Sequence, residues 1–229
     1  PAPSGITQGQ FATAFVGDWS YSGFTSPTRG GRYRFELQPN FGAARYLAAL
    51  ADYRRYSFHR PITFAFRFLH YGRYGRDAES DMLSPLFLGY ETFVRGYSSG
   101  SFSYSECSVD PKNPQACPEF DRLVGSRLAV VNAEFRIPLF GNENFGLVNF
   151  PYLPTELSLF LDGGVAWSHG APPTFKFARR SRERIPVFST GVSARVNVMG
   201  YAVVELYYAY PFQRPEKGWT FGFQVAPGW

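Results

Sequence analysis

The sequence predicts an all-β fold, and three observations support that prediction. Aromatic residues make up 19% of the 229 residues, with 24 Phe and 15 Tyr, and aromatic side chains are enriched in strands. The 23 Gly and 18 Pro fall mostly between segments in which apolar and polar residues alternate, as expected for turns between strands. Several of these segments also place a charged residue on the face that a soluble sandwich would bury.

Hydropathy leaves a membrane location open. The sequence has no run of about 18 or more apolar residues, so it predicts no transmembrane helix. In a membrane β-barrel only every second residue of each strand faces lipid, so the average hydropathy of a strand stays near neutral. The rule for helices therefore does not exclude a membrane protein built from strands.

Four alternating segments are expected to form strands in the N-terminal third of the chain. The first has an aromatic face, and the second alternates charged or amide side chains with apolar ones. In the fourth, three phenylalanines lie opposite Arg67, which suits a strand with lipid on one side and a wet lumen on the other. Residues 39–42 are expected to turn the chain, and residues 71–83 to form a polar connection. The four segments are residues 10–21, 32–38, 45–58 and 62–69.

Six further strands are expected in the remaining chain. The sixth strand of the series puts Glu134 on its polar face, and the seventh places Phe160 and Asp162 together on the inner face. The inner charges of the eighth and ninth strands are Arg195 and Glu205. The six segments are residues 85–93, 126–138, 156–166, 189–198, 201–210 and 219–225.

Two of the connections are long. Residues 95–125 form a loop of about thirty residues, and a loop of that length inside a compact fold is usually functional or disordered. Residues 168–186 form the second, whereas residues 39–44 and 197–202 are short and residues 141–155 are longer than ideal. Short periplasmic turns at one end and long external loops at the other are typical of outer-membrane barrels. By this rule both long loops would lie outside the cell.

Two cysteines, Cys107 and Cys117, lie ten residues apart in the first long loop. Such a pair fits a local disulfide in an oxidising compartment better than a zinc site, which would need two more ligands nearby. The three histidines are far apart in the sequence and form no metal-spaced pair: His59, His70 and His169. No metal site is therefore expected.

Charge and motifs do not favour an enzyme or a nucleic-acid-binding protein. The net charge of +5 comes with arginines scattered over many strands, and no recognition motif accompanies them. The serine-rich residues 98–105 lack a nucleophile-elbow pattern, and no helix follows the Gly-Gly pairs as a phosphate loop would require. We expect no catalytic residue and no cofactor. The arginines within residues 179–184 are expected in a solvated external loop, with lipopolysaccharide phosphates as a minor partner.

Four motifs and the C-terminal residue resemble a known family. They are Leu88-Gly89-Tyr90, Val94-Arg95-Gly96-Tyr97, Asn132-Ala133-Glu134-Phe135-Arg136-Ile137-Pro138, Phe160-Leu161-Asp162-Gly163-Gly164-Val165-Ala166-Trp167 and Trp229. In this order they resemble the C-terminal barrel of the BamA/TamA outer-membrane assembly family, in the bacterial surface antigen superfamily. The resemblance covers residues 88–229, and its strongest parts are the Val-Arg-Gly-aromatic motif and the strand that contains Asp162.

The resemblance implies an antiparallel transmembrane β-barrel in the bacterial outer membrane. Barrels of the family have sixteen strands and ten are expected here, so residues 1–229 are interpreted as the C-terminal portion of a single barrel domain with residues 95–125 as an external loop. The first six strands and any periplasmic modules would then precede Pro1. A small barrel closed by ten strands is the alternative.

The resemblance also implies a role for the loop motif at residues 94–97. Arg95 would fold back into the lumen and pair with Asp162 and Glu134, with Phe160 beside its guanidinium, while the glycine after it would allow a tight turn. A guanidinium is planar and permanently charged, and it can bind a carboxylate through two parallel hydrogen bonds. Such a pair anchors the loop and is not catalytic. The alternative is that both acidic residues are solvated charges of the lumen.

Aromatic residues of the last strand have two compatible interpretations. They form either an ordinary lipid-facing strand with an interfacial belt or, as the resemblance implies, a weakly paired seam of the barrel that also serves as an assembly signal. These residues are Trp219, Phe221, Phe223 and Trp229.

The function implied by the resemblance is assembly or insertion of outer-membrane proteins, without ATP or cofactor. The expected partners are outer-membrane lipid and lipopolysaccharide, client outer-membrane proteins and accessory lipoproteins, and no nucleic acid. A protein translocation pore or a surface antigen without insertase activity is the alternative within the superfamily. A soluble β-sandwich or lipocalin-like binder is disfavoured by the outward rows of phenylalanine.

Overall fold

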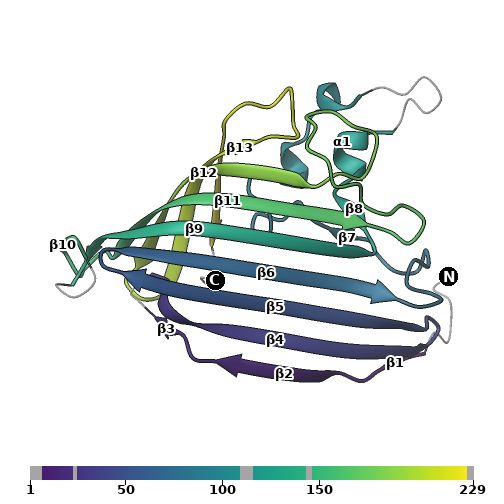
Figure 1. Ribbon diagram of the computed structural model, residues 1–229, viewed down its shortest axis with the longest axis horizontal. Coiled ribbons are helices and arrows are strands. Elements are labelled where there is room, and N and C mark those ends of the chain that lie inside the picture. Colours follow the sequence, from purple (N-terminus) through teal and green to yellow (C-terminus); the bar gives the residue numbers. More distant parts are fainter. Residues whose placement is uncertain (1–6, 23–24, 109–115, 143–145, 226–229) are drawn as a thin grey trace.

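A computed structural model describes residues 7–22, 25–108, 116–142 and 146–225. Nearly all regular structure in these residues is β-strand, and the long strands form one antiparallel sheet (Figure 1). The prediction of an all-β antiparallel fold is therefore confirmed. The helical segments of the described residues are the 3-10 turns Ser99–Ser101 and Tyr104–Glu106 and helix α1 (Pro118–Asp121).

Strands follow one another in the sheet in nearly the order of the chain. The path runs β1, β4, β5, β6, β9, β11, β12, β13, β14; β2 and β3 also pair with β4, and β10 pairs with β9. Strands β7 and β8 form a separate pair. The bounds are β1 Gln8–Gln10, β2 Thr13–Asp18, β3 Tyr21–Ser22, β4 Pro27–Gly42, β5 Tyr46–His59, β6 Ile62–Tyr74, β7 Leu86–Phe87, β8 Val124–Gly125, β9 Arg127–Gly141, β10 Val148–Asn149, β11 Thr155–Trp167, β12 Val187–Val198, β13 Ala202–Pro211 and β14 Thr220–Val225.

The sheet is open. Within the described residues β14 pairs with β13 alone, and no pairing joins it to β1, β2 or β3 at the other end of the sheet. Closure into a small barrel by ten strands is therefore not seen in this structure.

The expected fifth strand is wrong. Of residues 85–93 only β7 is a strand, and it pairs with β8 outside the main sheet. The apolar side chains of this region are buried against the inner face of the sheet: Leu88 and Val94 pack with Leu69 and Leu128. Their alternation therefore reflects burial inside the curved sheet and not strand pairing.

The predicted turn at residues 39–42 is also wrong, because β4 continues to Gly42: it pairs with β5 up to Asn40 and with β1 from Asn40 to Gly42. Pro39 lies opposite the interruption between β1 and β2, where its missing N–H removes no ladder hydrogen bond on that side. Strand β6 likewise runs to Tyr74, beyond the expected end at residue 69. Long strands thus replace part of the predicted connections.

The two ends of the sheet carry different connections. Among the described residues, what we call the loop end holds residues 43–45, 75–108, 116–126, 168–186 and 212–219, and what we call the turn end holds residues 60–61, 142, 146–154 and 199–201. The two longest connections share one end, as expected. The expected alternation of short and long connections fails in one place, since the short connection after β4 lies at the loop end.

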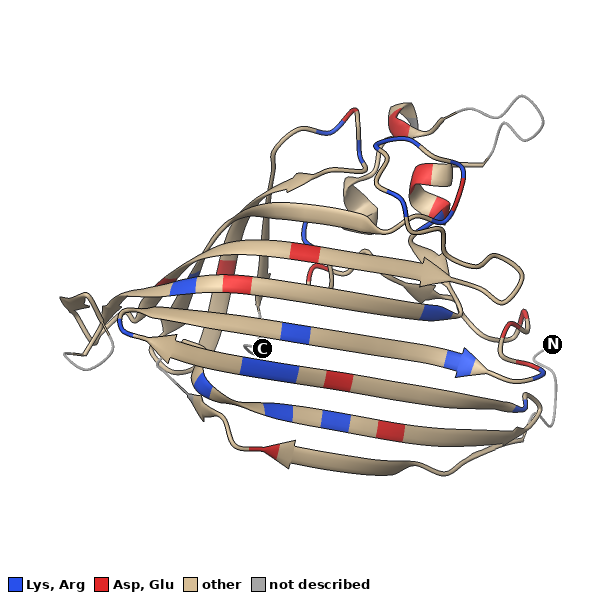
Figure 2. Cartoon of the chain, in the orientation of Figure 1, with Lys and Arg blue, Asp and Glu red and all other residues tan. Residues whose placement is uncertain are grey.

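The faces of the sheet are inverted relative to those of a water-soluble protein. The outer face exposes large apolar side chains, among them Phe135 (54%) and Leu159 (59%), whereas the inner face buries charged ones such as Arg67 and Glu134. Figure 2 shows charged residues as isolated bands along the strands. An apolar outside and a polar inside are the arrangement of a membrane β-barrel. None of the helices among the described residues is long and apolar enough to cross a membrane.

Part of the long connection between β6 and β9 fills the inner side of the sheet at the loop end. Leu88, Val94, Tyr97 and Leu123 from this connection form one buried cluster with residues of the sheet. The sheet contributes Leu69, Leu128, Val130, Ala166 and Val187. This apolar packing brings the Val-Arg-Gly-Tyr motif to the inner wall, where the polar site begins.

Candidate functional site

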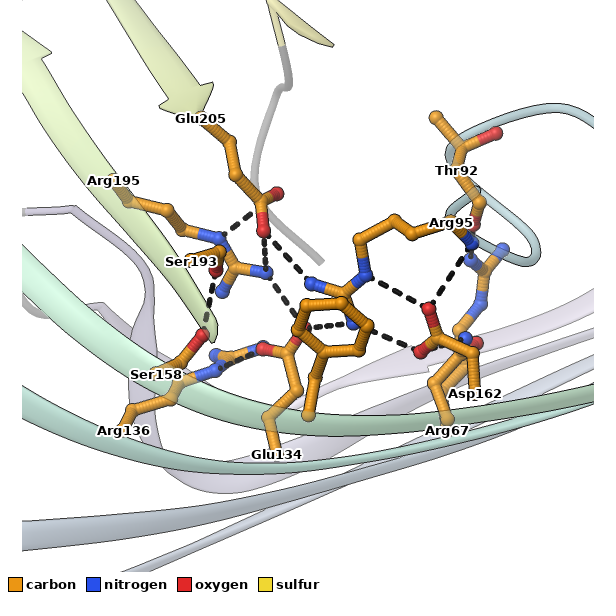
Figure 3. Close-up of polar contacts among 12 residues, drawn as sticks. Arg67, Thr92, Arg95, Glu134, Arg136, Ser158, Asp162, Ser193, Arg195 and Glu205 are labelled. Atoms are coloured by element: carbon orange, nitrogen blue, oxygen red, sulfur yellow. Dashed lines mark hydrogen bonds and ion pairs between the residues drawn. The ribbon is translucent and has the colours of Figure 1, made fainter. Parts of the chain in front are cut away.

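Arg95 lies inside the curved sheet and is only 2% exposed. Its Nε is 2.8 Å from Oδ2 of Asp162 and its Nη2 is 2.8 Å from Oδ1, so the guanidinium binds the carboxylate through two parallel hydrogen bonds (Figure 3). The backbone N–H of Arg95 also donates to Oδ2, at 3.2 Å. The structure therefore brings together the pair expected from the loop motif.

Two further carboxylates surround the same guanidinium. Nη2 of Arg95 lies 2.7 Å from Oε1 of Glu134, and Nη1 lies 2.8 Å from Oε1 of Glu205. The ring of Phe160 covers the guanidinium, with its centroid 3.5 Å from Cζ. Glu134 and Phe160 are thus where the resemblance placed them, whereas Glu205 was expected only as an inner charge.

Strand register explains why these side chains meet. Asp162 on β11 is paired with Asn132 on β9, and Phe160 is paired with Glu134, so all four share the inner face. On the other side, Glu205 of β13 is paired with Arg195 of β12. Those two positions are equally far from the β12–β13 turn, so their pairing could have been predicted from the hairpin that the sequence indicates.

The ion pairs around Arg95 belong to a larger buried network. Glu134 also accepts from Nε of Arg136 at 2.7 Å and from Nη2 of Arg195 at 2.8 Å. Arg195 reaches Glu205 at 3.3 Å and Glu156 at 3.6 Å. Burying a charge is costly unless it is paired and hydrogen-bonded, and the mutual pairing of these groups offsets that cost.

The backbone before Arg95 is held by the sheet as well. Nη1 of Arg67 donates to the carbonyl of Thr92 at 3.0 Å, and Nδ2 of Asn132 donates to the carbonyl of Phe93 at 2.8 Å. Arg67 is itself paired with Asp52 on β5, at 3.2 Å. No sequence pattern indicates these contacts, because they join side chains of the wall to carbonyls of a loop.

The residues that follow Arg95 are fitted closely to their surroundings. Gly96 has φ +87°, a conformation that favours glycine, and a Cβ there would lie 3.5 Å from atoms of Ala209 and Thr220. The hydroxyl of Tyr97 donates to the carbonyl of Phe188 at 3.0 Å. Burial raises the pKa of Tyr97, so its hydroxyl stays protonated and available as a donor.

Cys107 and Cys117 are joined by a disulfide in the structure. The two sides of this segment are also linked by Ser108, whose Oγ donates to Glu119 at 2.6 Å and whose N–H donates to the same carboxylate at 2.9 Å. The disulfide therefore closes a segment that further hydrogen bonds hold at its base.

Removal of the disulfide is expected to open the loop more readily. Replacing both cysteines by serine restores the chain entropy that the cross-link removes, which corresponds to about 2–3 kcal/mol for a short loop. Limited proteolysis should then cleave residues 95–125 at least roughly tenfold faster, since 1.4 kcal/mol corresponds to a tenfold change in an equilibrium. Reduced wild-type protein is the control and should match the variant. Unchanged cleavage would show that packing alone holds the loop.

The arginines of the second long loop contact protein groups. Nη2 of Arg179 donates to the hydroxyl of Tyr210 at 3.0 Å, Arg180 pairs with Glu216, and Nη1 of Arg184 donates to the carbonyl of Val124. These contacts join the loop to its neighbours at the loop end.

The aromatic side chains of the last strand point outward. Phe221 and Phe223 on β14 are 66% and 62% exposed, and Trp219, just before the strand, stacks on Tyr208 with ring centroids 5.1 Å apart. Trp229 lies outside the described residues. The described part of the expected seam is thus an apolar strand paired on one side.

A comparison with protein families agrees with the fold. The family model described as the Omp85 superfamily domain matches residues 11–228, which is nearly the whole chain. No curated protein matches the chain. The match confirms the resemblance to the outer-membrane assembly barrels of the surface antigen superfamily, and it includes both the loop motif and the strands that hold it. The chain belongs to the Omp85 superfamily.

Proposed function

We propose that this chain assembles or inserts outer-membrane proteins as part of a transmembrane β-barrel, without catalysis or a cofactor. Omp85 superfamily proteins are bacterial outer-membrane proteins concerned with protein assembly and transport. The observation that carries the proposal is the loop motif, with Arg95 bound to three inner-wall carboxylates beside a terminal strand that is paired on one side.

The barrel is proposed to be larger than the sheet described here. The sheet has an unpartnered edge at β14 within the described residues, and its outer face is apolar. Unpaired edges are a liability that barrels remove by closure. In this proposal further strands upstream in a longer chain, together with periplasmic modules, complete a sixteen-stranded barrel whose external loop is residues 95–125.

The proposed mechanism uses the edge of β14. An incoming client strand gains backbone hydrogen bonds by adding to an open edge. In this proposal the bilayer is locally thinned where the client enters. Outer-membrane lipid, lipopolysaccharide and accessory lipoproteins are the further partners of this proposal.

A translocation pore or surface antigen without insertase activity is the second candidate. The polar inner wall supports it, because Arg32, Arg34, Asp52 and Arg54 line a cavity of about 490 Å³ on the β2–β6 side of the sheet. The apolar cluster around Leu88 and Tyr97 argues against a wide passage, since it fills the inner side at the loop end. The first candidate is therefore preferred.

Reconstitution tests the proposal. Liposomes that contain the full chain should accelerate the folding of an unfolded client barrel, followed by its heat-modifiable migration on gels, relative to liposomes with an unrelated barrel of similar size. Arg95→Ala should reduce the acceleration. Absence of acceleration, with ion conductance across the same liposomes, would overturn the insertase proposal in favour of translocation. Extraction of the protein without detergent would contradict both candidates.

A further inference from the structure

Arg214 is a second buried arginine that contacts the long loop. It lies in the connection between β13 and β14 and is 0% exposed. Its Nε and Nη2 bind the carboxylate of Glu106 at 2.8 and 2.7 Å, and its Nη1 donates to the carbonyl of Gly96 at 2.7 Å. The two remaining N–H groups donate to Oγ and the carbonyl of Ser101, at 2.8 and 2.7 Å. All five donors of the guanidinium are therefore satisfied by one loop.

This set of contacts joins three separate parts of residues 95–125. Gly96 belongs to the Val-Arg-Gly-Tyr motif, Ser101 ends the first 3-10 turn, and Glu106 precedes the disulfide. The ring of Phe102 lies 3.9 Å from Cζ of Arg214 and completes the enclosure. Burial opposes ionisation of Glu106, but the hydrogen bonds from Arg214 and from the backbone N–H of Ser103, together with the nearby positive charges, outweigh it and keep the pKa of that carboxyl below its usual range.

The residue before Arg214 contacts the same motif. The backbone N–H of Gln213 donates to the Tyr97 hydroxyl at 3.0 Å, and its Oε1 accepts from the N–H of Phe188 at 2.7 Å. Gln213 is 1% exposed and Tyr97 is equally buried. The β13–β14 connection is thus packed on the loop motif over two consecutive residues.

A second link between the motif and the same hairpin lies inside the sheet. Arg95 binds Glu205 on β13 at 2.8 Å, and Glu205 accepts from Nε2 of Gln224 on β14 at 2.9 Å. Within the described residues β14 has no strand neighbour other than β13. The terminal hairpin is therefore tied to the loop at its connection, through Arg214, and at mid-strand, through Glu205.

We propose that Arg214 is a positioning residue that couples docking of the loop motif to the placement of the β13–β14 hairpin. While Arg214 holds Gly96 and Glu106, the docked loop keeps the hairpin in register at the edge of the sheet. Release of the loop frees the connection and weakens the pairing of β14. The inference deepens the proposed function, because β14 is the strand proposed to meet a client, but its test needs no client.

Amide hydrogen exchange of the full chain in detergent micelles tests the coupling. Arg214→Met removes the charge and all five hydrogen bonds at similar side-chain length. Exchange of the amides in residues 220–225 should rise roughly 5- to 150-fold, the usual range for coupling between two sites, while β4–β6 stay unchanged. Arg214→Lys keeps the charge but loses the two parallel bonds to Glu106, and it should give an intermediate rise. This second variant decides the test if the first does not fold.

The matched control is Arg180→Met. Arg180 also reaches the β13–β14 connection, through Glu216, but that pair is exposed, at 58% and 50%. Exposed ion pairs contribute little, so exchange in β14 should not change. A difference in β14 exchange between Arg180→Met and Arg214→Met therefore reports the effect of the buried contacts of Arg214 and not the loss of a surface charge.

Reciprocity separates coupling from a local structural role. Coupling between two sites is mutual, so Arg95→Ala should raise exchange in residues 212–225, and Arg214→Met should raise it in residues 92–97. A local role of Arg214 would raise exchange in the Arg214→Met protein only in its contact segments, residues 96–106 and 212–219, and would leave residues 212–219 unchanged in the Arg95→Ala protein. Those two results together would overturn the proposal. Intact coupling in a protein that fails to accelerate client folding would overturn the proposed function and leave this inference standing.

Discussion

Replacing Arg95 by alanine is expected to lower the unfolding free energy of the protein by roughly 3–5 kcal/mol, the usual cost of breaking a buried ion pair. The reason is that Asp162, Glu134 and Glu205 would remain buried without the cation that lies 2.7–2.8 Å from each of them. The loop would also lose its attachment to the wall. Urea unfolding in micelles, followed by tryptophan fluorescence, measures the first effect, and protease cleavage within residues 95–125 measures the second.

Two further variants make the Arg95 result specific. Arg95→Lys keeps the charge but cannot bind Asp162 through two parallel bonds while also reaching Glu205, so its loss of stability should fall between those of wild type and alanine. Arg180→Ala removes an exposed arginine and should change stability by about 1 kcal/mol or less. Equal stability of Arg95→Ala and Arg180→Ala would show that the buried pairs contribute nothing.

Replacing Asp162 by alanine is expected to have a similarly large effect. Its carboxylate accepts four hydrogen bonds: three come from Arg95, including the backbone N–H, and the fourth comes from Nδ2 of Asn132 at 2.9 Å. Removing it leaves buried donors without acceptors, and the loss should be roughly 3–5 kcal/mol. Glu183→Ala is the matched control, since Glu183 pairs with Lys176 at a site where it is 51% exposed.

A double-mutant cycle distinguishes a true pair from two independent losses. The Arg95→Ala/Asp162→Ala protein should be less destabilised than the sum of the single variants, with a coupling energy within the usual 0.5–3 kcal/mol for residues in contact. Additive losses would contradict the proposed anchor. The same unfolding assay serves for all three proteins, so differences between assays do not enter the cycle.

Much of the inner wall could be predicted because a strand has a period of two. Once residues 126–138 and 156–166 are taken as strands, Glu134 must share a face with Asn132, and Asp162 must share one with Phe160. The pairing of the two strands then shows that these are the same face of the sheet. The same rule places Arg195 and Glu205 inside and Phe221 and Phe223 outside. The pairing of Arg95 with these residues came from the resemblance, because no local pattern indicates where a loop arginine points.

The misassignments also have a common physical origin. Residues 85–93 alternate as a strand would, but Leu88 is buried and Phe87 and Phe93 are partly buried against the wall formed by other strands. Pro39 reads as a turn signal, but it lies where the neighbouring strand is interrupted. In both cases the deciding neighbour is distant in the sequence, so local propensity gives the wrong answer.

The site around the loop motif depends both on local sequence patterns and on the tertiary structure. The sequence by itself determined the all-β fold, the face on which each charged residue of the wall lies, and the motif that marks Arg95, because these depend on residues near one another in the chain. Only the tertiary structure decided that Glu205 completes the site, that Arg214 holds the loop from the β13–β14 connection, and that the sheet is open within the described residues. The contacts of Glu205 and Arg214 join residues far apart in the sequence, up to 118 positions in the hydrogen bond from Arg214 to Gly96. A pattern of neighbouring residues cannot indicate such a contact.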